Sequence, residues 1–195
     1  MKAPWTTVTC MTQVDEKQSY TTTFSVDRTP QEAFEAITDV RGWWSEDAVG
    51  VTDLVGGEFV HRYKDVHRCK IRVTELVPGR KVAWLVLENY FNFIEDQAEW
   101  KDTEIIFEIS EKVGGAEVHF THMGLVPQYE CYDVCSNAWG GYISGSLRNL
   151  INTGQGQPNP KEDGNAPAHQ DGATAARTER SPQAASGAGT ESDNA

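Results

Sequence analysis

Apolar and polar residues alternate along much of the chain between residues 20 and 124. The alternation is clearest at residues 20–26, where Tyr20, Thr22, Phe24 and Val26 stand at every second position among small hydroxyl residues. A period of two places alternate side chains on opposite faces of a sheet, so such a stretch predicts a half-buried strand. Five more strands are predicted at residues 58–64, 67–77, 81–90, 103–112 and 116–124.

Short turns join these strands, for example at residues 78–79 and 114–115. A parallel crossover needs a dozen or more residues, so the short turns predict an antiparallel meander. Within the strands one parity is largely apolar, whereas the other carries charged residues such as Arg68, Arg72 and Glu108. We therefore expect a sheet with one face in solvent and the other face covered.

Helices are predicted on both sides of this run of strands. Thr29, Pro30 and Glu32 form a capping box, with a hydroxyl at the N-cap, proline at the first helical position and glutamate three residues after the cap. This helix is expected to end near residue 39. A second short turn of helix is expected at residues 41–44, with its two indoles packed against the edge of the sheet.

A long helix is predicted over residues 129–152, because apolar side chains recur there every three or four positions. The recurring residues are Tyr132, Cys135, Trp139, Ile143, Leu147 and Leu150. This stripe would cover the dry face of the sheet, which predicts an α+β two-layer fold with an antiparallel sheet curled around one amphipathic helix. Gly140, Gly141 and Gly145 in this helix either leave room for a ligand or admit a neighbouring backbone.

The two ends of the chain differ in composition from its middle. Residues 154–195 contain no Val, Ile, Leu, Met, Phe, Trp, Tyr or Cys. Such a segment cannot offset the entropy of ordering, so a disordered acidic tail is expected there. Residues 1–17 lack a regular pattern and are expected to form a flexible arm or an extra edge strand. The folded domain would then span residues 18–153.

Composition narrows the classes of function. The 195 residues include 29 acidic and 17 basic side chains, a formal charge of −12, which argues against nucleic acid or anionic lipid as partners. No stretch approaches the roughly 20 apolar residues that span a bilayer. The first residues lack the apolar core of a secretory signal, so a cytoplasmic protein is expected. Four scattered cysteines, at positions 10, 69, 131 and 135, predict no disulfide.

The sequence contains no G-x-S-x-G, H-E-x-x-H, Walker or dinucleotide-binding motif. Cys131 and Cys135 share one helix face, but no second pair of Cys or His stands at zinc-like spacing. His119 and His122 have opposite parity on one strand and therefore cannot bind the same ion. We expect neither a metal nor a cofactor.

The order of several motifs along the chain resembles a known superfamily. These motifs are Trp43-Trp44, Val77-Pro78-Gly79-Arg80, Trp84, Trp100-x-x-Thr103, Thr121-His122-x-Gly124 and Trp139-x3-Ile143-x3-Leu147-x2-Leu150-x3-Gly154. They resemble the SRPBCC or START-like superfamily and are similar to the branch named for the C-terminal domain of the activator of the 90-kilodalton heat-shock-protein ATPase. The resemblance covers residues 20–154 and implies a helix-grip fold, in which a sheet wraps the C-terminal helix and leaves a cavity between them.

Relatives in this superfamily bind lipids, sterols, polyketides or hormones in that cavity, and a few are cyclases or aromatases. A cavity of this kind needs apolar walls with a few oriented polar groups. The candidate ligand-binding residues are Trp44, Phe59, His61, Tyr63, Trp84, Glu88, Tyr90, Phe107, Phe120, His122, Trp139 and Tyr142. Each aromatic residue among them could equally belong to an ordinary core.

Three polar candidates, His61, Glu88 and His122, have the parity of the apolar face. An inward Glu88 would have a raised pKa and could act in acid–base chemistry, unless it lies at the strand end and reaches water. Each histidine could contact a ligand or be a core histidine bonded to a backbone carbonyl. Residues 89–100 carry aromatic residues followed by acids, which fits a lid over the cavity or a long hairpin with an acidic tip.

These observations favour a monomeric or dimeric protein that binds a small hydrophobic ligand without catalysis. One alternative is an interaction module, a chaperone or stress accessory; however, the sequence lacks the N-terminal domain of the ATPase activator. Another is a cyclase- or hydrolase-like enzyme that uses Glu88 and a histidine.

Overall fold

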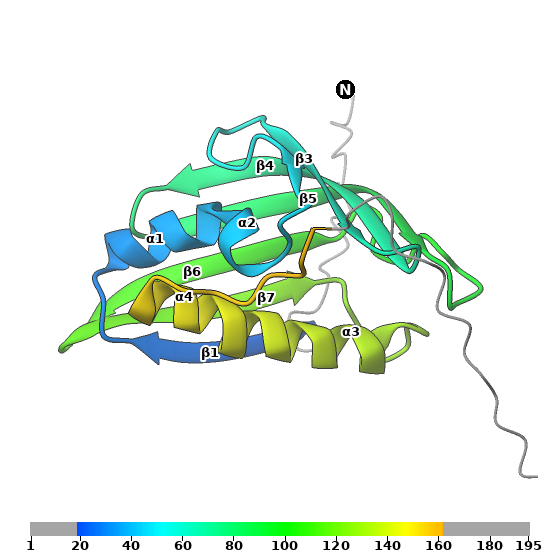
Figure 1. Ribbon diagram of the computed structural model, residues 1–195. Helices are drawn as coiled ribbons and strands as arrows, with labels where there is room; N and C mark the ends of the chain where they lie inside the picture. The colour runs from blue at the N-terminus through cyan, green and yellow to red at the C-terminus, as the bar shows by residue number, and fades with distance from the viewer. Residues whose placement is uncertain (1–18, 162–195) are drawn as a thin grey trace, which may run out of the picture. The chain divides into compact units, whose positions relative to one another are not determined.

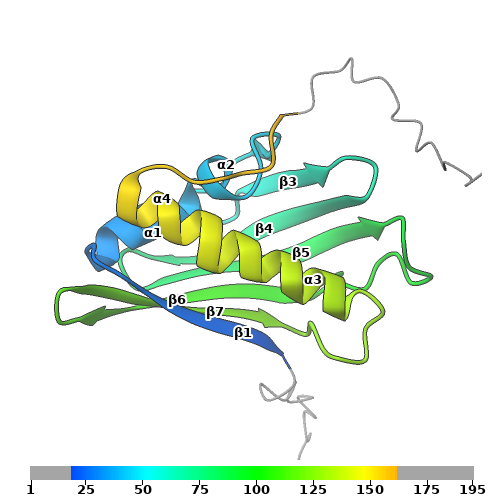
Figure 2. The same ribbon diagram turned by 60° about the horizontal axis from the view of Figure 1, so that its bottom comes forward.

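A computed structural model of the protein describes residues 19–161. Within these residues, seven strands form one antiparallel sheet in the order β1-β7-β6-β5-β4-β3-β2, and the helices lie against one face of it (Figures 1 and 2). The strands are β1 (Tyr20–Val26), β2 (Val49–Gly50), β3 (Glu58–Tyr63), β4 (His67–Val77), β5 (Lys81–Phe91), β6 (Glu104–Lys112) and β7 (Gly115–Met123). The helical segments are α1 (Pro30–Thr38), α2 (Val40–Trp43), α3 (Tyr132–Trp139), η2 (Gly140–Leu147) and α4 (Arg148–Thr153).

The antiparallel meander and the helix-grip architecture expected from the sequence are confirmed. Strands β3 to β7 are neighbours in chain order, and β1 pairs with β7, with Tyr20 opposite His122 and Val26 opposite Ala116. The two-residue strand β2 was not predicted, because two exposed residues carry no periodic pattern. It pairs with β3 and forms the edge of the described sheet.

The predicted capping box forms as expected. The backbone N–H of Glu32 donates to Thr29 Oγ1 at 3.2 Å, and the backbone N–H of Thr29 donates to Glu32 Oε2 at 2.8 Å. These two bonds satisfy donors that the first turn of a helix leaves without partners. Helix α1 therefore begins at Pro30 and ends at Thr38, with Asp39 as its C-cap.

The tryptophan pair after α1 lies over the middle of the sheet, so the predicted position at the sheet edge was wrong. Trp43 and Trp44 stack nearly parallel on Trp84 of the central strand β5, with ring centroids 6.5 and 6.3 Å away. All three indoles are at most 1% exposed. Large aromatic side chains contribute the most stabilising free energy when they are completely removed from water. This free energy favours a position of the short helix over the dry face of the sheet.

The C-terminal helical rod crosses the covered face of the sheet (Figure 2). It begins at Tyr132, three residues later than expected, and its middle third, η2, is a π-helix. The apolar side chains that are buried from its N-cap onward are spaced by four: Cys131, Cys135, Trp139, Ile143, Leu147 and Ile151. In an α-helix a step of four residues overshoots one turn by about 40°, so such a stripe would drift around the rod. A π-helical stretch has more residues per turn and keeps the stripe over the sheet.

The chain continues to pack on the domain beyond the expected boundary at residue 153. The backbone N–H of Gln157 donates to Ser146 Oγ at 2.6 Å, and the backbone N–H of Asn159 donates to the carbonyl oxygen of Trp44 at 3.0 Å. Hydrogen bonds of its backbone, rather than apolar side chains, hold this segment to the domain. A prediction based on apolar residues therefore ended the domain too early. The expected arm at residues 1–17 and the tail from residue 162 lie outside the described residues.

None of the helices formed by residues 19–161 has the length and apolar character needed to cross a membrane.

Candidate functional site

A hollow of about 120 Å³ lies between the C-terminal helical rod and the hairpin that joins β3 to β4. We call it the aromatic hollow. Its lining residues are Trp44, His61, Tyr63, Val66, His67, Phe91, Phe93, Trp100, Val134, Cys135, Ala138, Trp139 and Tyr142. Phe93 and Val134 are 40% and 57% exposed, so the mouth of the hollow lies between the 92–102 loop and α3.

Five of the predicted ligand-binding residues line this hollow: Trp44, His61, Tyr63, Trp139 and Tyr142. Four others, Phe59, Trp84, Phe107 and Phe120, lie in the solid core and are at most 1% exposed. Their rings pack edge to face, with centroids 5.3 Å apart for Phe59 and Trp84 and 5.1 Å apart for Phe107 and Phe120. These four rings pack closely on one another and do not line the hollow.

Glu88 and Tyr90 lie on the outer face of the sheet, so their predicted inward orientation was wrong. The register of β4 against β5 shifts between Lys70, paired with Glu88, and Ile71, paired with Val86. Leu87 is the extra residue of this bulge, and an extra residue reverses the facing of all residues beyond it. Glu88 is consequently exposed on the face opposite His61 and His122, so it cannot act together with either of these two histidines as predicted for an enzyme.

The same bulge explains why sequence analysis missed part of the lining. Beyond Leu87 the inward parity changes, and Phe91 becomes 2% exposed against the hollow. The other lining residues that were not predicted are Val66, His67, Phe93, Trp100, Val134, Cys135 and Ala138. Phe93 and Trp100 belong to the segment that sequence analysis interpreted as a lid, and its aromatic residues were the signal that could have found them. Cys135 belongs to the buried stripe of the rod, and Val134 and Ala138 lie on the helix face beside it.

His61 supplies a polar atom without a partner next to the hollow. Its ring stacks on Trp44 at a centroid distance of 4.2 Å, and it is 1% exposed. Its Nδ1 atom is buried and makes no hydrogen bond with the described residues. Burial, reinforced by His67 nearby, lowers the pKa of His61 well below its usual value. The imidazole is therefore neutral at pH 7, and one of its ring nitrogens is satisfied by none of the described residues.

Two further histidines stand near the hollow with their hydrogen bonds made. His67 Nε2 lies 2.9 Å from Asn89 Oδ1, and burial lowers the pKa of His67 to about 4. His122 accepts from Trp139 Nε1 at Nδ1, at 3.0 Å, and its Nε2 lies 2.9 Å from Thr103 Oγ1. Burial lowers the pKa of His122 to about 3. His122 is thus a core histidine, bonded to side chains rather than to a backbone carbonyl.

The 92–102 loop closes one side of the hollow and is held to the start of α3. The carboxylate of Glu99 is buried and accepts from the backbone N–H groups of Glu130, at 2.7 Å, and Cys131, at 3.0 Å. Glu130 Oε2 in turn accepts from the backbone N–H of Glu95 at 2.8 Å. The loop turns Trp100 inward, as expected of a lid, whereas Glu99 is buried and not in water as that interpretation required.

The Cys131 thiol, directly before α3, is a poor nucleophile. A hydrogen bond with Cys135, together with burial, raises the pKa of the Cys131 thiol, so it stays protonated at neutral pH. Cys69, Cys131 and Cys135 are buried free thiols. Between residues 19 and 161, no group of three or more His, Cys, Asp or Glu side chains is placed to hold a metal ion.

The family model described as "Activator of Hsp90 ATPase homolog 1-like protein" matches residues 27–152. The solution structure of the Aha1 dimer from Colwellia psychrerythraea is similar, with a TM-score of 0.57 and 23% identity over 71% of this chain and 98% of that chain.

Two crystal structures have the same fold. One, from Mesorhizobium loti, has a TM-score of 0.56 and 14% identity, and covers 69% of this chain and 96% of that chain. The other, from Chromobacterium violaceum, has a TM-score of 0.54 and 17% identity, with 69% and 97% covered. No curated protein sequence matches the chain significantly.

Proposed function

This chain belongs to the family of activator of Hsp90 ATPase homolog 1-like proteins, and on that premise we propose that it binds a compact, largely apolar molecule in the aromatic hollow without transforming it. The observation that carries the proposal is the unpartnered Nδ1 atom of His61 beside an apolar hollow. A buried polar atom without a partner costs free energy that a hydrogen bond from a ligand would recover. Apolar walls with few polar groups are the usual composition of a small-molecule site.

The size of the hollow limits the ligand. Drug-sized molecules occupy pockets of roughly 300–1,000 Å³, whereas an apolar cavity of about 150 Å³ in another protein accommodates benzene. At about 120 Å³, the hollow suits one aromatic ring that carries one hydrogen-bonding group. A sterol-sized ligand requires displacement of the 92–102 loop, which the two backbone bonds to Glu99 oppose.

The absence of catalysis is part of the proposal, and three observations on the described residues support it. Glu88 lies on the opposite face of the sheet from the hollow. The Cys131 thiol has a raised pKa and is therefore a weak nucleophile. His61 has no carboxylate or hydroxyl partner that would activate a nucleophile through it.

Phenol is a suitable probe, because it is one ring with one hydroxyl. For such a small ligand a dissociation constant of about 0.1–1 mM is expected. Titration followed by amide NMR shifts should move the signals of residues that line the hollow, and native mass spectrometry of the purified protein should detect a bound apolar molecule. The proposal is wrong if phenol moves none of these signals up to its solubility limit and no ligand co-purifies.

Two neighbouring positions of α3 provide a matched pair of variants. Ala138 lines the hollow and Asn137 does not, and both are exposed. In Ala138→Phe the new ring should fill the mouth and weaken phenol binding about tenfold or more. Asn137→Phe adds the same ring one position away and should bind phenol as the wild type does. Equal effects of the two substitutions would place phenol elsewhere.

A further inference from the structure

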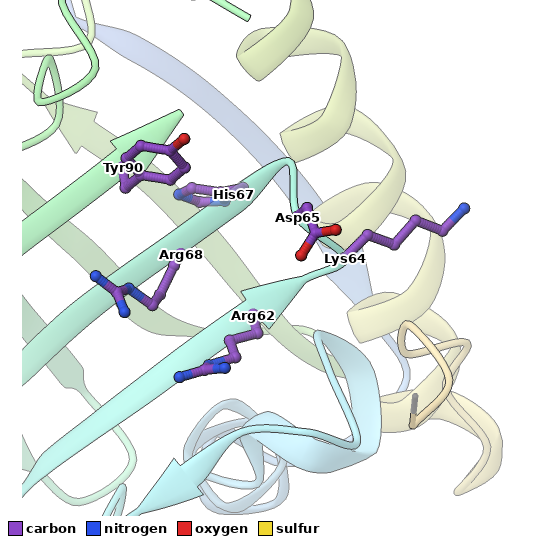
Figure 3. A pocket seen from close by; sticks show the side chains of 6 residues that line it. All are labelled: Arg62, Lys64, Asp65, His67, Arg68 and Tyr90. Carbon is purple, nitrogen blue, oxygen red and sulfur yellow. The ribbon is translucent and has the colours of Figure 1, made fainter. Parts of the chain in front are cut away.

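The outer face of the sheet carries a second, shallow hollow of about 440 Å³, which we call the outer groove. Its lining residues are Arg62, Lys64, Asp65, His67, Arg68 and Tyr90 (Figure 3). In this view the side chains of Arg62 and Arg68 project from adjacent strands, whereas that of Lys64 extends away from them. The groove lies across the sheet from most of the aromatic hollow, and the inference below does not rest on the function proposed for that hollow.

Three outer residues form a row across β3, β4 and β5. Arg62 pairs with Arg68 in the β3–β4 register, and Arg68 pairs with Tyr90 in the β4–β5 register. All three are exposed. Like charges that stand directly opposite each other on neighbouring strands repel and destabilise a sheet. Tyr90 belongs to this row because the bulge at Leu87 turns its side chain to the outer face.

Neighbouring cations on the same face are neutralised, but these two are not. Lys70 Nζ and Arg72 Nη2 each lie 2.7 Å from the carboxylate of Glu58. Among residues 19–161, the guanidinium groups of Arg62 and Arg68 take part in no ion pair or hydrogen bond. This holds although Asp65 lines the outer groove and Glu88 lines a second hollow that both arginines also line. Acidic residues are not scarce, since the chain has 29 of them against 17 basic ones.

We propose that Arg62 and Arg68 bind the phosphate group of a small molecule in the outer groove. A phosphate monoester has three terminal oxygens and nearly two negative charges, so it can accept from two guanidinium groups at once. A carboxylate has two oxygens and one charge, which a single arginine already satisfies. The phosphate removes the repulsion between the two arginines, and the ring of Tyr90 forms a wall against the rest of the ligand.

The test measures phosphate binding to the full chain at low, constant ionic strength by isothermal titration. Inorganic phosphate should bind more tightly than acetate at equal concentration. Arg62→Gln and Arg68→Gln should each weaken phosphate binding about tenfold or more, since each removes a charge-assisted hydrogen bond. Arg72→Gln is the matched control, because Arg72 lies on the same strand and face but is already paired with Glu58. It should bind phosphate within about twofold of the wild type.

A second arm distinguishes the source of the phosphate. Tighter binding of phenyl phosphate than of inorganic phosphate assigns the groove to a phosphate ester with a ring against Tyr90, whereas equal binding assigns it to the free anion.

Thermal unfolding checks that the variants fold: Arg68→Gln should be at least as stable as the wild type without phosphate, and should lose the phosphate-dependent increase in Tm. Acetate binding as tight as phosphate, or an equal loss in Arg72→Gln, would overturn the proposal.

Discussion

At the scale of single residues, the histidines around the aromatic hollow are uncharged at neutral pH. Burial lowers the pKa of His67 to about 4 and of His122 to about 3, and that of His61 lies well below its ordinary value. His122 is held in one tautomer by Trp139, which donates to its Nδ1. The interior thus contains imidazole rings that are buried in their neutral form.

These histidines make stability depend on pH in a defined direction. In the unfolded chain a histidine takes up its proton near pH 6.5, whereas the buried His67 stays neutral down to about pH 4. Protonation therefore favours the unfolded chain in this window, so stability is highest above pH 6.5 and falls as the pH decreases. Each such histidine contributes a slope of about 1.4 kcal/mol per pH unit.

His61→Phe tests this prediction. The variant keeps an aromatic ring on Trp44 and removes both the titrating group and the unpartnered Nδ1. We expect the free energy of unfolding at pH 7 to be equal or higher. The loss of stability as the pH falls below 6.5, measured by urea unfolding at several pH values, should be less steep than in the wild type, because one fewer group takes up a proton on unfolding. An unchanged slope would mean that His61 binds its proton equally well in both states.

At the scale of elements, the C-terminal rod combines α-helical and π-helical turns so that one stripe faces the sheet. Sequence analysis left two explanations for its glycines, space for a ligand or close approach of backbone. A Cβ atom at Gly141 or Gly145 would meet nothing within 4 Å, and one at Gly140 would meet only the Tyr20 hydroxyl at 3.8 Å. Close approach of backbone therefore does not explain these three glycines, and none of them lines the aromatic hollow.

Gly141→Ala should consequently stabilise the protein. The methyl group meets no neighbour, and alanine loses less backbone entropy than glycine on folding, by up to about 1 kcal/mol. Thermal unfolding should give a higher Tm. Gly115→Ala provides the contrast, since its Cβ would collide with the backbone carbonyl oxygen of Val26. That variant should lose stability. A lower Tm for Gly141→Ala would show that alanine disturbs the π-helical turns.

At the scale of the whole described domain, the chain returns after α4 and packs beside the tryptophan pair. Ser146 Oγ donates to the carbonyl oxygen of Trp43 at 2.7 Å and accepts from the backbone of Gln157. Asn159 Nδ2 donates to the hydroxyl of Tyr142, a residue that lines the aromatic hollow. The returning segment thus connects α2, η2 and the wall of the hollow.

Gly156→Ala should release this segment while the sheet stays folded. A Cβ atom at Gly156 would collide with the backbone carbonyl oxygen of Gly42, which cannot move without disturbing α2. Hydrogen exchange should become faster at the amides of Gln157 and Asn159 and remain slow in the strands. Gln155→Ala, at an exposed neighbouring position, should leave exchange unchanged. Slow exchange in Gly156→Ala would mean that the contact adjusts locally.

The sequence predicted the fold more completely than the candidate site. The capping box at Thr29 and the meander follow from local patterns and were confirmed. Of the predicted ligand-binding residues, those on the C-terminal rod, Trp139 and Tyr142, do line the hollow. Glu88 and Tyr90 were misplaced because one bulge reversed the parity of β5 beyond Leu87. A bulge depends on the pairing of two strands, so neither strand shows it alone.

The sequence by itself determined the order of the main strands and helices along the chain, their antiparallel pairing and, except in β5 beyond Leu87, the face of each strand that is buried, because periodicity, caps and turns act between residues close in the chain. Only the tertiary structure decided which buried aromatic rings pack solidly and which leave a hollow, and which cations on the outer face keep no partner. Both depend on how far side chains reach across neighbouring elements, and that is set by register and packing between segments distant in the sequence.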